Sequence, residues 1–150
     1  MKIWVDADAC PGAVKEVIFR AAERRRVETV LVANRPLQLP PSPWIRALKV
    51  ADGFDVADNA IAAAVAKDDI VVTADIPLAA EVIAKGAHAL NPRGEVYDDD
   101  TVRQKRAMRD FMDTMRASGV HSGGPPPYAA RDKKAFADAF DRLLARYAPR

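Results

Sequence analysis

Four aspartates stand where carboxylates can do chemistry. Asp6 and Asp8 follow a short apolar, β-prone run at residues 3–5, and Asp75 follows a second such run. Asp58 lies one turn into an alanine-rich helical segment, where a charge is otherwise unexplained. Carboxylates grouped in this way must be neutralised by a helix N-terminus, a basic side chain or a cation. We expect a divalent cation, and because oxygen-only ligands favour Mg²⁺ or Mn²⁺ over zinc, we expect one of these two ions.

The order of the strands decides whether these carboxylates meet. If the two runs are neighbouring parallel strands, their carboxyl ends lie about 5 Å apart. Asp6, Asp8 and Asp75 then share one crevice at the edge where open α/β sheets bind ligands, and Asp58 reaches it from above. Such a cluster suits metal-assisted hydrolysis of a phosphodiester. We therefore take all four aspartates as candidate metal ligands and catalytic residues.

The competing interpretation is that single aspartates cap helices. Asp75 comes shortly before Pro77, and Asp8 shortly before Pro11, and each proline is expected to open a helix. An aspartate in that position is a favoured N-cap, because its side chain accepts a bond from a free backbone N–H. Two such sites, one with a doubled carboxylate, make capping alone a less complete explanation.

Basic residues that can hold a phosphate backbone form two groups. Arg35 and Arg93 are in loops that follow strands, at the same edge of the sheet as the aspartates. The other four share one predicted helix: Arg103, Lys105, Arg106 and Arg109. Such contacts position a nucleic acid without reading its sequence, so the expected partner is RNA or another phosphate polyanion. The alternative is a solvated helical face.

Three further residues are weighed as nucleophiles or ligands. Cys10 lies near a helix N-terminus, which lowers a thiol pKa, but a phosphatase cradle needs Arg six residues on, and Glu16 stands there. We therefore expect Cys10 to be a packed residue. His88, in an apolar strand, is also expected to be packed, and His121 has no partner that the sequence identifies.

Hydrophobic patterning predicts the elements that position these residues. Strands are expected at 3–5, 27–33, 44–50, 70–73 and 87–90, and helices at 11–26, 55–67, 77–85, 101–117 and 131–147. Asp55 is the expected N-cap of its helix, and Gly86 is expected to close the helix before it. In the helix 101–117, the residues expected to face inward are Val102, Met108, Phe111, Met112 and Met115.

The alternation of these elements predicts an α/β fold, with a parallel sheet between two layers of helices. Residues 1–150 are expected to form a single domain with a core at about 1–97. Residues from about 98 to 150 form a C-terminal helical extension packed on the sheet, because two helices alone bury too little surface to fold independently.

Composition limits the class of protein. The chain has 150 residues, of which 49% are hydrophobic and 29% charged, enough for one domain with a core. Residues 1–100 hold 12 Lys or Arg and 16 Asp or Glu, whereas residues 101–150 hold 11 and 5, so an acidic front precedes a basic tail. A single cysteine fits a reducing cytosol. No apolar run approaches the roughly 20 residues that span a bilayer, so we expect a cytoplasmic protein of undetermined oligomeric state.

Five motifs, in order through nearly the whole chain, resemble the bacterial YaiI/YqxD family. They are D-A-D-A-C-P at 6–11, V-A-N at 32–34, D-V-A-D at 55–58, V-V-T-A-D-I-P-L-A at 71–79 and G-G-P-P-P-Y at 123–128. That family is grouped with PIN-like domains, which are typically Mg²⁺- or Mn²⁺-dependent ribonucleases. The resemblance implies a PIN-like fold and a metal cluster at Asp6, Asp8, Asp58 and Asp75. This chain has Ala74 where Gln is more common, and Asp58 where PIN-like domains commonly have Glu.

Three functions remain open at this point. The first is a metal-dependent nuclease acting on RNA. The second is a non-catalytic RNA- or protein-binding module on the same scaffold, which would use the basic face at 103–109. The third is a haloacid-dehalogenase-like phosphatase, in which Asp6 attacks phosphate and Asp8 is the acid/base, although the acidic pair Asp68-Asp69 comes before a strand and not after it.

Overall fold

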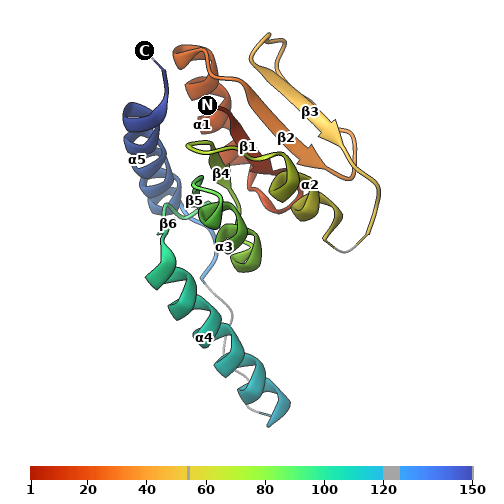
Figure 1. The fold of residues 1–150 in the computed structure, drawn as a ribbon, viewed down its shortest axis with the longest axis vertical. Coiled ribbons are helices and arrows are strands. Elements are labelled where there is room, and N and C mark those ends of the chain that lie inside the picture. Colours follow the sequence, from red (N-terminus) through yellow and green to blue (C-terminus); the bar gives the residue numbers. More distant parts are fainter. Residues whose placement is uncertain (54, 120–125, 150) are drawn as a thin grey trace.

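A six-stranded sheet forms the centre of the molecule, in the order β3-β2-β1-β4-β5-β6 (Figure 1). The computed structural model describes residues 1–53, 55–119 and 126–149. The strands are β1 (Ile3–Asp6), β2 (Thr29–Ala33), β3 (Ile45–Lys49), β4 (Ile70–Val72), β5 (His88–Leu90) and β6 (Val96–Tyr97). All pairs are parallel except β5–β6, which is antiparallel.

Helices cover both faces of the sheet, which gives the three-layer α/β architecture expected from the sequence. They are α1 (Gly12–Arg25), α2 (Val56–Ala64), α3 (Ile76–Ala84), α4 (Asp99–Ala117) and α5 (Ala130–Tyr147), with a one-turn 3₁₀ helix η1 (Ala7–Ala9) after β1. Helices α1 and α5 pack on one face, and α2 and α3 pack on the other. Helix α4 leaves the body at β6 and projects beyond the sheet (Figure 1).

The central position of β1 is what brings the predicted site residues together. It pairs with β2 on one side and with β4 on the other, with Val5 opposite Val72. The expected neighbourhood of the first strand and the strand at 70–73 is therefore confirmed. Both strands are buried on both faces, which explains why they read as continuous apolar runs and not as alternating ones.

Each face of the sheet has its own hydrophobic core. On the α1/α5 face, Phe136, Phe140 and Leu144 of α5 pack in one cluster with Ile3 and Val5 of β1, and all five are almost fully buried. The rings of Phe136 and Phe140 stack with centroids 5.2 Å apart. On the other face the cluster includes Trp4, Ile61, Leu78 and Val82. Successive residues of β1 thus serve opposite cores, as the pleat of a strand requires.

Asp69 anchors the amino ends of β1 and β4. Its side chain is 3% exposed and accepts hydrogen bonds from the Lys2 backbone N–H at 2.9 Å, the Trp4 Nε1 at 3.0 Å and the Ala66 backbone N–H at 2.9 Å. Both carboxylate oxygens are used, so the buried charge is compensated by three donors. This aspartate is structural, and it lies at the edge of the sheet opposite the predicted site.

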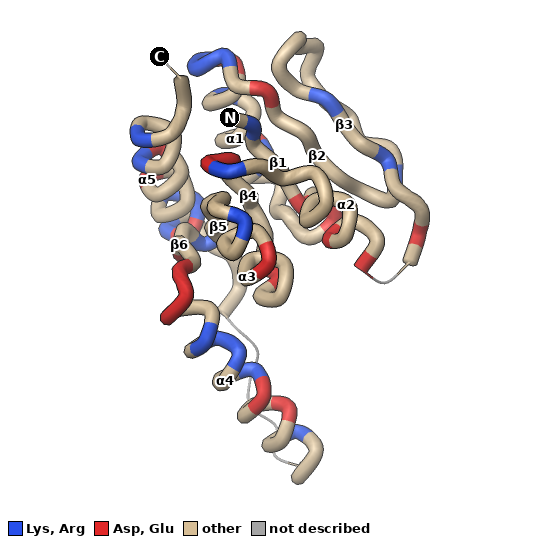
Figure 2. Tube along the Cα trace, in the orientation of Figure 1, with Lys and Arg blue, Asp and Glu red and all other residues tan. Residues whose placement is uncertain are grey.

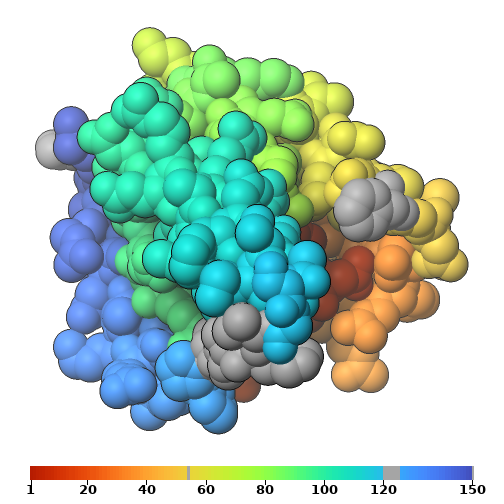
Figure 3. All heavy atoms as spheres, turned by 90° about the horizontal axis from the view of Figure 1, so that it is seen from below, coloured from red at the N-terminus to blue at the C-terminus, as the bar shows by residue number. Residues whose placement is uncertain are grey.

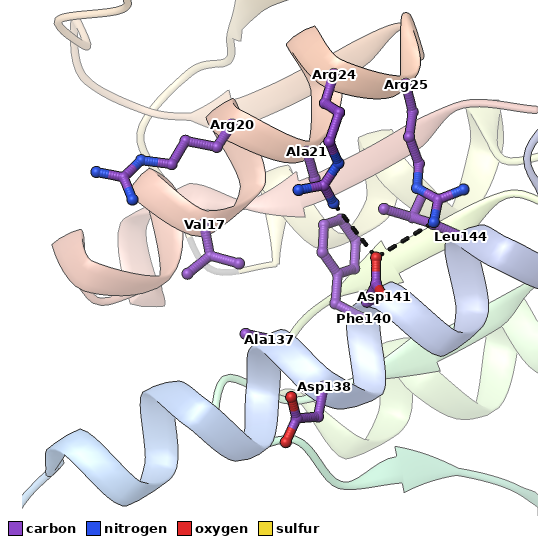
Figure 4. Close-up of a pocket in the computed structure, with 10 residues that line it drawn as sticks. All are labelled: Val17, Arg20, Ala21, Arg24, Arg25, Ala137, Asp138, Phe140, Asp141 and Leu144. Carbon is purple, nitrogen blue, oxygen red and sulfur yellow. Dashed lines mark hydrogen bonds and ion pairs between the residues drawn. The ribbon is translucent and has the colours of Figure 1, made fainter.

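A groove of about 520 Å³ separates part of α1 from α5 (Figure 4). Arg24 and Arg25 both donate to Oδ1 of Asp141, at 3.3 and 3.2 Å, across a floor that includes Phe140 and Leu144. The groove is lined by the C-terminal half of α1, whereas the predicted site lies at the end where α1 begins. It is therefore a feature of how the two helices pack.

Two expectations about the elements were wrong. Strand β6 was not predicted, because two residues carry no periodicity that distinguishes a strand from a loop. Met108 and Phe111 of α4, expected to face inward, are 61% and 58% exposed. Their spacing does mark one side of a helix, and Val102 on that side is buried at the start of α4, but α4 then extends past the sheet and leaves Met108 and Phe111 exposed.

Candidate metal centre

Three carboxylates converge at the carboxyl edge of the sheet, where β1 and β4 end. Asp55, Asp58 and Asp75 each place one oxygen so that the three atoms lie within 4.8 Å of one another. Asp55 and Asp58 flank the start of α2, and Asp75 stands between β4 and α3. We call these three residues the acidic triad. Two of its members, Asp58 and Asp75, were predicted from the sequence.

Asp75 has two roles at once. As the N-cap of α3, it accepts a hydrogen bond from the Leu78 backbone N–H through Oδ1 at 2.8 Å, and Pro77 occupies the first turn. The cap uses Oδ1, and the same carboxylate is also hydrogen-bonded with the Asp58 side chain and belongs to the acidic triad. The capping and the metal-binding interpretations of Asp75 are therefore compatible.

Asp55 was expected to be the N-cap of α2; this position is confirmed, but the capping hydrogen bond of its side chain is not made. Its backbone has φ 62°, in the left-handed region that Asp tolerates better than most residues. The carboxylate instead joins the triad. The one signal in the sequence was the D-V-A-D spacing, since residues three apart lie on the same side of a helix start.

Asp6 borders the triad through Thr73. The Thr73 hydroxyl is 2% exposed; it donates to Oδ2 of Asp6 at 3.2 Å and accepts from the Asp75 backbone N–H at 3.0 Å. Burial raises the pKa of Asp6, opposed by the hydrogen bond from Thr73 and reinforced by the charges of Asp75 and Asp8. The carboxylates of Asp75 and Asp8 are therefore close enough to Asp6 for their negative charges to raise its pKa.

Asp58 carries the strongest sign of crowding. Burial, followed by the charges of Asp75 and Asp6, raises the pKa of Asp58 from 3.8 to about 7. A raised carboxyl pKa means that the ionised form lacks compensation in this arrangement. A cation between the carboxylates would supply that compensation, and the oxygen-only donor set fits Mg²⁺ or Mn²⁺. Mg²⁺ commonly keeps several waters, so a few carboxylates suffice to hold it.

Asp8 lies at the rim of this cluster. Its Oδ2 accepts from the Asn34 backbone N–H at 2.9 Å, and its Oδ1 lies 3.5 Å from Nε of Arg35. It lines a small cavity of about 90 Å³ together with Asp55 and Asp58. Asp8 is not a helix cap, and Arg35 partly neutralises it. Arg35 therefore has a partner at the site in addition to any phosphate.

A cavity of about 250 Å³ opens over the triad. It is lined by all three triad residues, by Glu81 of α3 and by Arg109 of α4. Seen from below, the N-terminal segment in red lies recessed between α4 in cyan and the orange and yellow segments (Figure 3). Glu81 is a lining residue that sequence reasoning did not single out, because its helical setting alone carries no functional signal.

The other basic candidates are mostly paired with protein groups. Arg103 pairs with Asp100 at 2.6 Å, and Lys105 with Glu95 at 2.8 Å. In Figure 2, acidic residues alternate with basic ones along α4, so this helix is less basic than its four predicted contacts suggested. Arg109 alone of the four lines the acidic cavity. Arg106 is exposed, and the structure gives it no ion pair within the residues it describes.

The remaining predicted candidates lie outside the site or are unreactive. Cys10 is buried, and burial raises the pKa of its thiol to about 12, which agrees with a packed residue. His88 stacks on Tyr147 with ring centroids 3.8 Å apart and lies 3.2 Å from Oδ1 of Asp68. His121 lies outside the described residues.

Fold and site together define an α/β protein with a carboxylate cluster at the carboxyl edge of a mostly parallel sheet. The chain belongs to the YaiI/YqxD family, since the family model described as "Uncharacterized BCR, YaiI/YqxD family" matches residues 4–146. No solved structure matches the chain. Among the described residues, none of the helices has the length and apolar character needed to cross a membrane.

Close relatives support the family assignment. A UPF0178 protein of Halorhodospira halophila is 62% identical over 146 residues, covering 97% of this chain and 97% of the relative. A UPF0178 protein of Thioalkalivibrio sulfidiphilus is 60% identical over 146 residues, covering 97% and 99%. A UPF0178 protein of Yersinia enterocolitica is 62% identical over 144 residues, covering 96% and 95%.

Proposed function

We propose that this protein is a divalent-metal-dependent nuclease that cleaves RNA phosphodiesters at the acidic triad. One observation carries the proposal: three carboxylate oxygens from two separate chain segments lie within 4.8 Å of one another, with further negative charge from Asp6 beside them. A cluster of like charges costs stability unless something compensates it, and such clusters are typical of functional sites. The resemblance to PIN-like domains points to the same chemistry.

The residues divide into groups that hold a cation and groups that orient them. Asp55, Asp58 and Asp75 would hold Mg²⁺ or Mn²⁺, with Asp6 as a further or water-mediated ligand. Thr73 fixes Asp6 relative to Asp75. When bound, such an ion stabilises charge on a phosphate oxygen and lowers the pKa of a coordinated water.

Two arginines are placed to hold the substrate at this cluster. Arg109 lines the cavity over the triad, and Arg35 lies at its rim beside Asp8. A guanidinium binds phosphate oxygens through charge-assisted hydrogen bonds. Both arginines therefore keep a polyanion near a site whose own charge would otherwise repel it.

The test is metal-dependent cleavage of a labelled single-stranded RNA. We expect cleavage with Mn²⁺ or Mg²⁺, none with EDTA, and a loss of at least about 100-fold in Asp75→Asn and Asp6→Asn, since losing groups that orient a ligand already costs about 10- to 100-fold. Asp138→Asn, an exposed carboxylate on α5, is the matched control and should cleave normally. Cleavage that persists in both site variants would come from a contaminant and would contradict the proposal.

A second candidate function has one observation in its favour. Met108 and Phe111 are exposed on the projecting helix α4, next to exposed basic residues. This suits a non-catalytic RNA- or protein-binding module that works through α4. Salt-sensitive RNA binding that survives Asp6→Asn and Asp75→Asn, without cleavage at any divalent ion, would favour it over the nuclease. A covalent aspartyl-phosphate on Asp6 would instead point to the phosphatase.

A further inference from the structure

A second pocket, of about 250 Å³, opens at the same edge of the sheet as the acidic triad. Its walls include Ala9 of η1, Pro11, Ala74, Pro92, Arg93 and Tyr128. Ala74 lies between Thr73 and the triad residue Asp75, and Ala9 directly follows Asp8, so the pocket shares the segments after β1 and β4 with the acidic site. We call it the Tyr128 pocket.

The Tyr128 pocket is rigidly built. The Tyr128 hydroxyl donates to the Pro92 carbonyl at 2.8 Å. The Arg93 guanidinium lies 5.7 Å from the centre of the Tyr128 ring, and it is held there by Asp132 at 3.2 Å and by the Pro126 carbonyl at 2.6 Å. The carboxylate of Asp132 is only 14% exposed. A phenol ring and a flat guanidinium are thus fixed in place before any ligand arrives, which lowers the entropy cost of binding.

Its polar groups are mostly used within the protein. Oδ1 of Asn91, which also borders the pocket, accepts from the backbone N–H groups of Arg93 and Glu95, both at 3.0 Å, and its Nδ2 donates to Glu95 at 3.2 Å. With the Tyr128 hydroxyl also engaged, neither side chain is available to read the edge of a ligand. Apart from the Arg93 guanidinium, which lies over the Tyr128 ring, the pocket offers an aromatic ring and apolar walls.

We propose that the Tyr128 pocket takes one unpaired nucleobase of a single-stranded RNA, next to the phosphodiester held at the triad. This inference rests on the proposed function, because the triad supplies the phosphate end of the substrate. The pocket volume lies below the roughly 300–1,000 Å³ of pockets for drug-sized ligands, which suits a single ring system. Base stacking on an aromatic side chain is tolerant of sequence, because every base has a π-face.

The same geometry excludes a base-paired substrate. A base inside a duplex is stacked between its neighbours and reaches a protein pocket only if it is extruded, whereas an unpaired base is free to enter. The pocket therefore selects single strands over duplexes and discriminates little among the four bases. The protein would thus distinguish single-stranded from double-stranded RNA, and would not distinguish one base sequence from another.

The experiment compares the binding of two RNA oligonucleotides in EDTA, where no cleavage is expected. One carries 2-aminopurine at a single position, and the other has an abasic site there. We expect the full-length protein to quench the 2-aminopurine fluorescence and to bind the abasic strand more weakly. Tyr128→Ala should weaken binding of the 2-aminopurine strand by about 5- to 150-fold and leave binding of the abasic strand unchanged.

Controls separate stacking from folding. Tyr128→Phe keeps the ring and should retain most of the affinity. Tyr147→Ala removes a tyrosine that stacks on His88 at the opposite edge of the sheet, so it should bind both strands as the wild type does. Thermal melts of all variants confirm that each is folded. Equal loss for both strands in a folded Tyr128→Ala protein, or no loss at all, overturns the inference.

The outcome for the pocket is independent of the outcome for the nuclease. Tyr128-dependent quenching without any cleavage by the wild type would retain the pocket and reject the metal-dependent nuclease. Cleavage with equal affinity for the base-bearing and the abasic strand would retain the nuclease and reject the pocket. An unlabelled RNA duplex should not displace the 2-aminopurine strand, and efficient displacement by the duplex would also reject the pocket.

Discussion

The Thr73 hydroxyl links Asp6, the last residue of β1, to Asp75, which follows β4. These two strands are neighbours at the centre of the sheet. The hydroxyl donates to Oδ2 of Asp6 at 3.2 Å and accepts from the backbone N–H of Asp75 at 3.0 Å. A single hydroxyl thus sets both the orientation of one carboxylate and the backbone of the other. At 2% exposure, Thr73 is shielded from bulk solvent.

Thr73→Val should loosen the site without unfolding the protein. Valine has the same shape but no hydroxyl, so Asp6 loses the hydrogen bond that lowers its pKa. We expect Mn²⁺ affinity to fall by about 10- to 100-fold, as is typical when a group that orients a ligand is lost. Isothermal titration with Mn²⁺ measures the change. Thr73→Ser keeps the hydroxyl and should restore most of the affinity; equal losses in both variants would assign Thr73 a packing role only.

The metal-free protein should lose stability as the pH rises from about 4 to about 7, because of Asp58. Its folded-state pKa is about 7, against an ordinary value of 3.8. Below about pH 4 both states hold the proton and the effect is absent. Between the two pKa values only the unfolded state releases it, so rising pH favours unfolding, and the penalty is complete above about pH 7.

Asp58→Asn removes this titration. The difference in melting temperature between the variant and the wild type should therefore grow from pH 4 to pH 8, in favour of the variant, when both are measured in EDTA. Adding Mn²⁺ at pH 8 should stabilise the wild type more than the variant. A difference that is independent of pH would show that Asp58 is ionised without penalty.

Asp69→Ala should be strongly destabilising although the residue is far from the acidic triad. The substitution leaves three donors without their acceptor, among them the buried Trp4 indole N–H. We expect a loss of about 3–5 kcal/mol in the free energy of unfolding, measured by urea titration with Trp fluorescence. Asp68→Asn, next to it and half-exposed, should change stability by less than about 1 kcal/mol. Similar values for the two variants would contradict the anchoring role.

Gly94→Ala should displace α5. A Cβ on Gly94 would lie 2.5 Å from the carbonyl carbon and oxygen of Ala135, and its φ of +88° is unfavourable for alanine. Gly119→Ala is a matched control, because Gly119 has a similar φ of +83° and no neighbour among the described residues within 4 Å of the added atom. We expect the control to cost about 1 kcal/mol and Gly94→Ala at least twice that. Equal losses of stability in the two variants would mean that α5 moves away from the added methyl group at little energetic cost.

Cys10 should resist alkylation in the folded protein. Burial raises its thiol pKa to about 12, so almost no thiolate is present at pH 8. Iodoacetamide should label the urea-unfolded protein rapidly and the native protein far more slowly, as followed by intact mass. Rapid labelling of the native protein would reopen Cys10 as a reactive residue.

Local patterning predicts much of this molecule, and it fails where tertiary geometry decides. The apolar runs before Asp6 and Asp75 mark two buried strands, which the sequence predicts. That these strands are neighbours was a condition of the prediction, and the pairing of β1 with β4 meets it. The place of Asp55 in the triad does not follow, because it depends on a left-handed backbone that brings the side chain round toward Asp75. Asp is a favoured N-cap residue, so the sequence alone predicted a capping role for Asp55.

The helix α4 shows a different limit. Its apolar residues recur at helical spacing, which predicts a helix with one apolar side. Spacing contains no information on whether another element is within reach, and α4 runs beyond the sheet, leaving Met108 and Phe111 exposed. Arg109 is in the reverse situation: its neighbours on the helix indicated a solvated face, yet the course of α4 carries it to the acidic cavity.

Because α5 contributes to the core, this core can be completed only after the C-terminal part of the chain has been synthesised. Ile3 and Val5 are among the first residues to leave the ribosome, yet Phe136, Phe140 and Leu144, which share their core, follow every strand in the chain. Domains generally fold as units during synthesis, and exposed apolar surface on an incomplete unit promotes aggregation. A nascent chain halted before residue 130 would present one side of its sheet covered only by α1, and would be a natural client for a chaperone until translation resumes.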